Sequence, residues 1–199
     1  MANASVGMLY PVFAPQTSHT AGSMPVYGTG RVIQEARGAS VTPEYTENPL
    51  YGDNAIVDED NGMTGLTIEF ESTGLDDADR KLLFDEDEIS AGGLTCQAVS
   101  DNATPYGGFA YIAKMRDKGV LTYEAWITLK IKFTETRRET RTQEGNQITW
   151  GTPTITGRAA SLDIDGSGKN RYQLHETFTT ISAAKAWINT LLNVSAATT

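Results

Sequence analysis

The sequence predicts a mainly β, antiparallel fold with two short helices. Three observations lead to this fold class. Apolar and polar residues alternate strictly over 121–133, as they do in a half-buried strand. Segments rich in Gly, Asp and Lys interrupt such stretches in the way that hairpin turns do. Helical spacing of apolar residues is confined to two segments, 73–84 and 180–192.

The segment 121–133 is the clearest predicted strand. Its odd-numbered residues are expected on one buried face and its even-numbered residues on a polar face. The turn residues Arg116–Gly119 precede it, and 106–115 before them is rich in aromatic and small residues. Residues 106–134 are therefore predicted to form one long antiparallel hairpin.

Five further strands are expected. In 65–71 the apolar residues Leu66, Ile68 and Phe70 alternate with polar ones. The others are 31–41, 147–158 with a kink at Gly151, 171–178, and 8–13, where Pro11 favours an edge position.

Both predicted helices carry capping signals. In 73–84, Asp76 and Asp77 lie near the start, where carboxylates favour the helix dipole, and Leu75, Leu82 and Leu83 form the apolar side. In the helix near the C-terminus, about 180–192, Thr180 can serve as the N-cap. The apolar residues of that helix recur at helical spacing: Ile181, Ala184, Trp187, Ile188 and Leu191.

The segment 42–64 contains turn residues throughout and shows little periodicity, so we expect a long loop. A loop of that length is usually functional or disordered. Because no repeat and no linker composition is visible, residues 1–199 are expected to form a single domain.

Composition narrows the classes of function. The formal net charge of -9 disfavours binding to nucleic acid through phosphates and adhesion to an anionic membrane. No apolar stretch is long enough to span a bilayer, and the first residues lack a secretory pattern, so the chain is expected in the cytoplasm where it is made. The lone Cys96 cannot form an intrachain disulfide and fits a small buried hydrophobe better than a nucleophile.

Two acidic stretches are considered as metal sites. Residues 163–168 begin like a calcium loop, but the twelfth position is Leu174 rather than Glu, so a hairpin turn is favoured. The run 85–88 is read as a solvated surface, as is 58–61. Phosphate-binding loops and nucleophile elbows are absent from the sequence. We therefore expect no metal, no cofactor and no catalytic residue, and a structural or binding role rather than an enzyme.

Five motifs, in order along nearly the whole chain, resemble the major tail tube proteins of siphophages, the long non-contractile-tailed bacteriophages, particularly those of Gram-positive hosts. The motifs are Gly7–Val12, Leu50–Asn54, Pro105–Tyr111, Thr149–Gly157 and Ala183–Ile188. Gly52 and Ala110 depart from the residues usual in the family, and 164–177 matches least.

The resemblance implies a β-sandwich with flanking helices. It also implies an assembly, in which hexameric rings, their inner sheets joined into one barrel, stack into a tube around a tape-measure protein. Tail-tip and tail-terminator proteins are the further implied partners, and DNA passes through without sequence-specific binding. The implied location is the tail of the virion, after assembly in the host cytoplasm.

On this hypothesis the polar faces of two strands line the lumen, with the candidates Thr67, Glu69, Glu71, Thr128, Lys130 and Lys132. The alternative is that these are ordinary solvent-facing residues of a monomeric sandwich. The segment 42–64 is the candidate contact between rings, through Leu50, Tyr51, Asp53, Asn54, Asp58 and Asp60.

Two other functions remain open. A receptor-binding or decoration module of a virion predicts a discrete oligomer and a groove lined by aromatic residues, with Tyr10, Tyr27, Tyr45 and Tyr51 as candidates. A cell-wall hydrolase is disfavoured by the missing catalytic motifs.

Overall fold

The fold was analysed in a computed structural model, which describes residues 4–33, 36–52, 55–86, 88–89, 94–95, 103–117, 119–137 and 154–195. For 47–52 and 55–61 only the backbone is described. The chain forms eleven strands and two helices in these residues: β1 (Ala4–Ser18), β2 (Val26–Tyr27), β3 (Arg31–Val32), β4 (Ala36–Gly52), β5 (Ala55–Ser72), α1 (Asp77–Phe84), β6 (Glu88–Ile89), β7 (Leu94–Thr95), β8 (Gly107–Asp117), β9 (Val120–Arg137), β10 (Thr154–Ala159), β11 (Gln173–Phe178) and α2 (Ile181–Leu191). Strand dominates, so the predicted mainly β class is confirmed. Cys96 and the predicted segment 147–153, including the kink at Gly151, lie outside the described residues.

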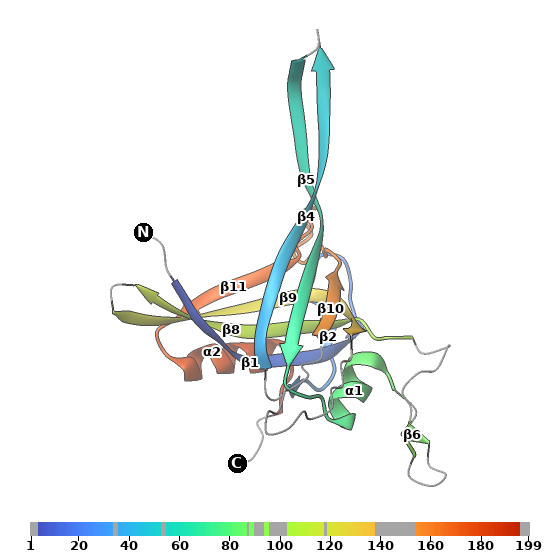
Figure 1. The fold of residues 1–199 in the computed structure, drawn as a ribbon, viewed down its shortest axis with the longest axis vertical. Coiled ribbons are helices and arrows are strands. Elements are labelled where there is room, and N and C mark those ends of the chain that lie inside the picture. The colour runs from blue at the N-terminus through green and yellow to red at the C-terminus, as the bar shows by residue number, and fades with distance from the viewer. Residues whose placement is uncertain are drawn as a thin grey trace, which may run out of the picture.

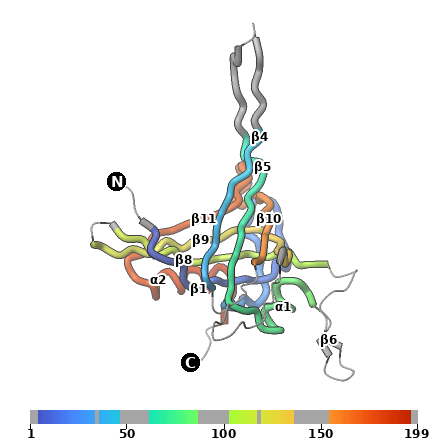
Figure 2. Tube along the Cα trace, in the orientation of Figure 1, coloured from blue at the N-terminus to red at the C-terminus, as the bar shows by residue number. Residues whose placement is uncertain are grey.

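One large antiparallel sheet contains most of the strands, in the order β2-β1-β8-β9-β10-β5-β4. Strand β9 connects its parts. One edge of β9 pairs with β8, while the other edge pairs with β11 near the start of the strand and with β10 near its end. The sheet is not a closed barrel. Figure 2 shows the traces of β4 and β5 crossing those of β1, β8 and β9 steeply, so one half of the sheet folds over the other.

A β-bulge in β9 divides the buried residues of this strand between two cores. Phe109 lies opposite Thr128, whereas Gly107 lies opposite Ile131, so β9 contains one residue more than β8 over this interval. An extra residue reverses the inward and outward positions beyond it. The prediction of a single buried face along 121–133 was therefore wrong, because alternation in sequence does not reveal a bulge.

The first core lies between the two halves of the sheet and is rich in aromatic residues. Phe133 contacts the rings of Phe13 and Phe109 edge-on, at centroid distances of 5.8 and 5.2 Å. Gly157 lies opposite Phe133, and a Cβ at Gly157 would come within 2.6 Å of that ring, so glycine is needed there. The fully buried members of this core also include Ile68, Phe70, Leu83, Ile131 and Ile155.

The second core lies between the sheet and α2. Ala125 and Ile127 of β9 belong to it together with Ala184 and Ile188 of α2. Thr180 caps the helix as predicted, since its Oγ1 accepts a hydrogen bond from the N–H of Ala183. The remaining predicted apolar residues of α2 are only half-buried at the edge of this core: Ile181, Trp187 and Leu191.

The expected loop 42–64 is instead part of a long two-stranded hairpin. Strands β4 and β5 pair continuously, apart from bulges, up to Gly52 opposite Ala55. Figure 1 shows this hairpin extending well beyond the rest of the molecule. The turn-like composition misled the sequence reading because β4 is the last strand of the sheet. Prolines such as Pro43 and Pro49 are tolerated in such an edge strand, where no ladder hydrogen bond on the outer side is lost.

The prediction that Pro11 marks an edge strand was only partly right. Among the described residues, Ala4 to Leu9 of β1 pair with β8 alone, but after Pro11 the strand also pairs with β3 and then with β2. Pro11 also lies at a bulge, because β1 has one residue more between Leu9 and Val12 than β8 has between their partners Ile112 and Ala110. Tyr10 at this bulge has a positive φ of 54°. A bulge is the other position at which a sheet accepts proline.

The first predicted helix is confirmed as α1, and its surroundings show charges that the sequence did not signal. Asp76 is the N-cap and accepts a hydrogen bond from the N–H of Asp79 at 2.6 Å. The guanidinium of Arg80 is buried and contacts carboxylates of Glu86 and Glu135, each at 3.2 Å. The prediction that 85–88 is a solvated run was therefore wrong for Glu86, which is only 5% exposed.

Candidate functional site

The outward side of the folded-over part of the sheet is the most extended polar surface that the strand pairing defines. In β5, Leu66, Ile68 and Phe70 point into the first core, so Thr67, Glu69 and Glu71 point away from it. Cross-strand pairing places neighbours from β4, β10 and β9 on the same side. We call this surface the polar face; its residues are Ser40, Thr42, Glu44, Thr67, Glu69, Glu71, Thr154, Thr156, Arg158, Lys132 and Thr134.

Four strands form the polar face, and their pairing is direct. One row runs Thr42, Thr67, Arg158 and Lys132; the next runs Ser40, Glu69, Thr156 and Thr134. Thr67, Glu69, Glu71 and Lys132 thus share one surface, as the sequence predicted for these lumen candidates. Whether that surface faces a lumen or bulk solvent stays a hypothesis.

Lys130 extends the same surface, whereas Thr128 does not. The ammonium groups of Lys130 and Lys132 lie 4.6 and 5.6 Å from the centre of the Tyr106 ring, within the range of cation–π attraction. Thr128, by contrast, is fully buried, and its Oγ1 accepts a hydrogen bond from Nε2 of Gln173. The assignment of Thr128 to a water-facing surface was wrong, because the bulge in β9 lies between Thr128 and Lys132.

Charges on the polar face are only partly paired. The carboxylate of Glu44 accepts a hydrogen bond from Oγ1 of Thr67 at 2.6 Å and contacts Nη2 of Arg158 at 2.9 Å. These two interactions, the Thr67 hydrogen bond first, hold the pKa of Glu44 below its usual value. Glu69 and Glu71 make no ion pair within the described part of the chain. They line a shallow hollow together with Gly38, Ala39 and Ser40 of β4.

Both edges of this four-stranded region lack a further strand among the described residues. Within those ranges, β4 pairs with β5 alone, and its other side has no strand partner. At the opposite edge, the pairing of β9 with β8 ends at Ile131, so no described strand pairs with the side of residues 132–137 that faces away from β10. On the polar face, Glu44 lies on β4, Glu69 and Glu71 lie on β5, and Lys132 lies on β9. Arg37 of β4 and Glu135 of β9 carry the opposite charges at the same two strands. Unpaired edges of this kind are templates for another chain.

The candidate inter-ring residues occupy the far part of the β4–β5 hairpin. Leu50 lies directly opposite Asp58, while Tyr51 lies opposite Ile56. Asp60 faces Asn48. Asp53 and Asn54, between the two strands, are outside the described residues. The described candidates, Leu50, Tyr51, Asp58 and Asp60, belong to a hairpin arm rather than to an irregular loop.

The tyrosines proposed for a binding groove are not gathered in one. Tyr27 is buried, and its hydroxyl donates to the carbonyl of Leu129 at 2.6 Å; burial raises the pKa of Tyr27 well above its usual value. The Tyr10 hydroxyl donates to Asn189 of α2. Tyr45 is exposed on β4. For Tyr51 only the backbone is described.

The 163–168 segment forms a turn, as predicted. The carboxylate of Asp163 accepts backbone N–H groups of Asp165, Gly166 and Gly168. Asp165 contacts Arg171 at 2.7 Å, and the turn is closed by the antiparallel bridge between Leu162 and Arg171. Across the described ranges, no three His, Cys, Asp or Glu side chains are grouped as a metal site would need. The same ranges contain no helix long and apolar enough to span a membrane.

Comparisons with known proteins add a structural likeness. No protein-family model matches the chain, and no curated protein matches it. The chain is similar to one in a solved structure described as "Cryo-EM structure of the anti-feeding prophage (AFP) baseplate, 6-fold symmetrised". The two are 14% identical, the match covers 89% of this chain and 97% of the other, and the TM-score is 0.35. The function proposed below is argued from the geometry of the polar face and the sequence motifs, not from this likeness.

Proposed function

We propose that this chain is a virion structural protein, specifically the subunit of a phage tail tube. Hexameric rings of it stack around a tape-measure protein and form the conduit through which DNA is ejected. The observation that carries the proposal is the four-stranded region β9-β10-β5-β4, which is polar on one face, packed on the other, and open at both edges.

Ring closure is the arrangement that satisfies both open edges at once. If β4 of one copy pairs with residues 132–137 of β9 in the next, no edge of this region remains exposed. A head-to-tail contact of this kind closes into a ring when the rotation per copy allows it. The polar faces then form one continuous inner wall.

The charges on the polar face favour the same pairing. Glu44 and Glu69 lie beside the β4 edge, and Lys130 and Lys132 lie beside the β9 edge. Joining the two edges brings opposite charges together across the subunit boundary, which favours correct register. The net charge of -9 suits a conduit that repels phosphates rather than binding them.

The hairpin arm supplies the contact between rings in this proposal. Because β4 and β5 extend far beyond the body of the molecule (Figure 1), the arm can reach a copy in a neighbouring ring. The other partners would be the tail-tip complex that starts the tube and the terminator that caps it. No catalytic step and no cofactor is part of this function.

Electron microscopy of the purified protein, alone and with a tail-tip complex as nucleator, tests the proposal. Hollow tubes or sixfold rings are expected. A protein that stays monomeric at high concentration with the nucleator present would contradict a tube subunit. A discrete trimer would support the decoration or receptor-binding function instead.

A shortened hairpin separates ring formation from stacking. Residues 47–61 are replaced by a two-residue Asn-Gly turn joining Thr46 to Gly62, which face each other in the ladder. We expect cooperative unfolding with a Tm close to that of wild type, intact rings and no tubes. The matched control inserts two residues between Gly166 and Ser167, in the exposed turn, and should form tubes normally. Normal tubes from the shortened hairpin would show that the arm is not the joint.

A further inference from the structure

A second surface, at the far end of the β8–β9 hairpin, combines exposed apolar and basic side chains. Val120 and Leu121 are 65% and 39% exposed, and Val6 and Leu9 of the adjoining strand β1 are 56% and 37% exposed. Exposed apolar groups gathered in this way mark contact sites. We call this surface the hairpin tip; it consists of Val6, Leu9, Lys114, Arg116, Val120 and Leu121.

Strand pairing brings most of these residues to one side of the hairpin. Arg116 lies directly opposite Leu121 on β9 and opposite Ala4 on β1, whereas Val120 lies opposite Asp117 and so points to the other side. Lys114 lies opposite Gly7, and Leu9 lies opposite Ile112, two positions before Lys114 on β8. Neither Lys114 nor Arg116 forms an ion pair with any residue that the structure describes. In an acidic protein, the hairpin tip is thus a local surface with exposed apolar side chains and two basic side chains that have no ion-pair partner among the described residues.

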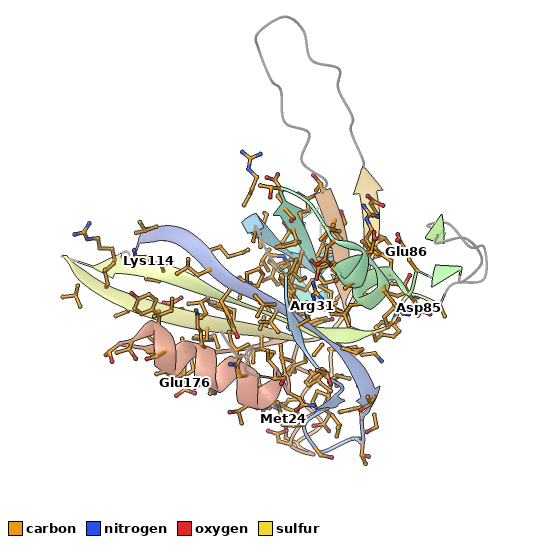
Figure 3. The ribbon with its side chains drawn as sticks, turned by 90° about the horizontal axis from the view of Figure 1, so that it is seen from below. Met24, Arg31, Asp85, Glu86, Lys114 and Glu176 are labelled. Carbon is orange, nitrogen blue, oxygen red and sulfur yellow. The ribbon has the colours of Figure 1, made fainter. Side chains whose placement is uncertain are left out.

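The opposite end of the molecule has the complementary charge. Between residues 76 and 85 the exposed charged side chains are the carboxylates of Asp76, Asp77 and Asp85 together with Lys81. Asp76 also pairs with Arg31, but Asp77 has no ion-pair partner in the described ranges. Figure 3 shows Lys114 at one end of the molecule and Asp85 and Glu86 at the other, and Figure 1 shows α1 remote from the β8–β9 turn.

We propose that the hairpin tip of one copy docks on the α1 end of a second copy. The two surfaces lie at opposite ends, so they cannot meet within one molecule, and the contact between copies is head-to-tail. The opposite charges set the orientation, and the exposed apolar side chains on the docking side of the hairpin tip lose contact with water when the surfaces meet. This contact is separate from the open sheet edges. The docking proposal rests on the proposed function in one respect, since both require copies of the chain to associate with each other.

A charge-swap cycle tests the contact by sedimentation velocity over a range of protein concentrations. Arg116→Glu and Asp77→Arg should each weaken self-association by roughly tenfold. The double variant should recover most of the loss, because the two surfaces again carry opposite charges, with their signs exchanged. Lys169→Glu, an equal charge change in the exposed turn, is the control and should leave association unchanged. Higher salt should weaken the self-association of wild type, because salt screens the opposite charges. Leu121→Ser should weaken self-association less than high salt does, because it removes only one apolar contact.

The outcomes separate this contact from the proposed function. If Arg116→Glu associates as tightly as wild type, or if wild type stays monomeric up to its solubility limit, the docking proposal is wrong. Normal tubes from Arg116→Glu in the microscope would reject the docking contact and leave the tube function standing. Association that depends on Arg116 and Asp77 but yields neither rings nor tubes would keep the contact and reject the tube function.

Discussion

Replacing Phe133 by alanine is expected to remove one of the largest single contributions to the stability of the first core. Phe133 is 1% exposed and packs edge-on against the rings of Phe13 and Phe109. Truncating a buried phenylalanine costs about 3–5 kcal/mol, depending on how far the cavity collapses. Here the residue opposite is Gly157, which has no side chain to move into the space. We therefore expect the upper part of the range, about 4–5 kcal/mol.

Thermal and urea unfolding followed by circular dichroism measure this change. For a chain of this size the loss corresponds to a fall in Tm of roughly 10–18 °C. Tyr45→Ala, which removes an aromatic ring that is 59% exposed, is the control and should change stability by less than about 0.5 kcal/mol. A loss below about 2 kcal/mol for Phe133→Ala would refute the assignment of Phe133 to a tightly packed core.

Two further predictions concern α2 and the polar face. Trp187 is half-buried and packs on Phe178 at a ring-centroid distance of 6.0 Å. Trp187→Ala should therefore lower the free energy of unfolding in urea by about 2 kcal/mol, less than the 3–5 kcal/mol of a fully buried ring. A loss above about 4 kcal/mol would place Trp187 in the core. The pKa of Glu44 is lowered by the hydrogen bond from Thr67 and by the contact with Arg158. Ionised Glu44 therefore stabilises the fold at pH values above its ordinary pKa of 4.5. This contribution is lost as the pH falls through the lowered pKa of the folded state. The difference in Tm between wild type and Glu44→Gln should therefore shrink as the pH is lowered from 7 towards 3, and a constant difference would contradict the assignment.

The strand and helix predictions succeeded where the pattern was local. The hairpin 106–134 and the cap at Thr180 are present because alternation, turn residues and capping act within a few neighbouring residues. The hairpin arm was missed because its composition resembles a loop. Strands β4 and β5 form a two-stranded ribbon in the arm, and β4 is the last strand of the sheet. Burial does not impose alternation of apolar and polar residues in such strands, and proline is tolerated in an edge strand.

The sequence predicted four of the residues on the polar face, and its error at Thr128 is informative. Alternation in 65–71 and 121–133 identified Thr67, Glu69, Glu71 and Lys132 as outward residues, which strand pairing then placed side by side. Thr128 failed because a bulge shifts the register by one residue. The contributions of Glu44, Arg158 and Tyr106 were not foreseen, since they reach the face through pairings between strands distant in sequence.

By itself, the sequence determined the fold class, the main hairpin, both helices and the inward or outward sense of most strand residues. These properties follow from periodicity and from short-range turn and cap chemistry. Only the tertiary structure decided that β9 serves two cores, that the described residues of 42–64 belong to a hairpin arm, and that the polar face ends at two strand edges with no further partner among the described residues. Those features depend on strand register and on which strands become neighbours, and both are set by contacts between residues far apart in the chain.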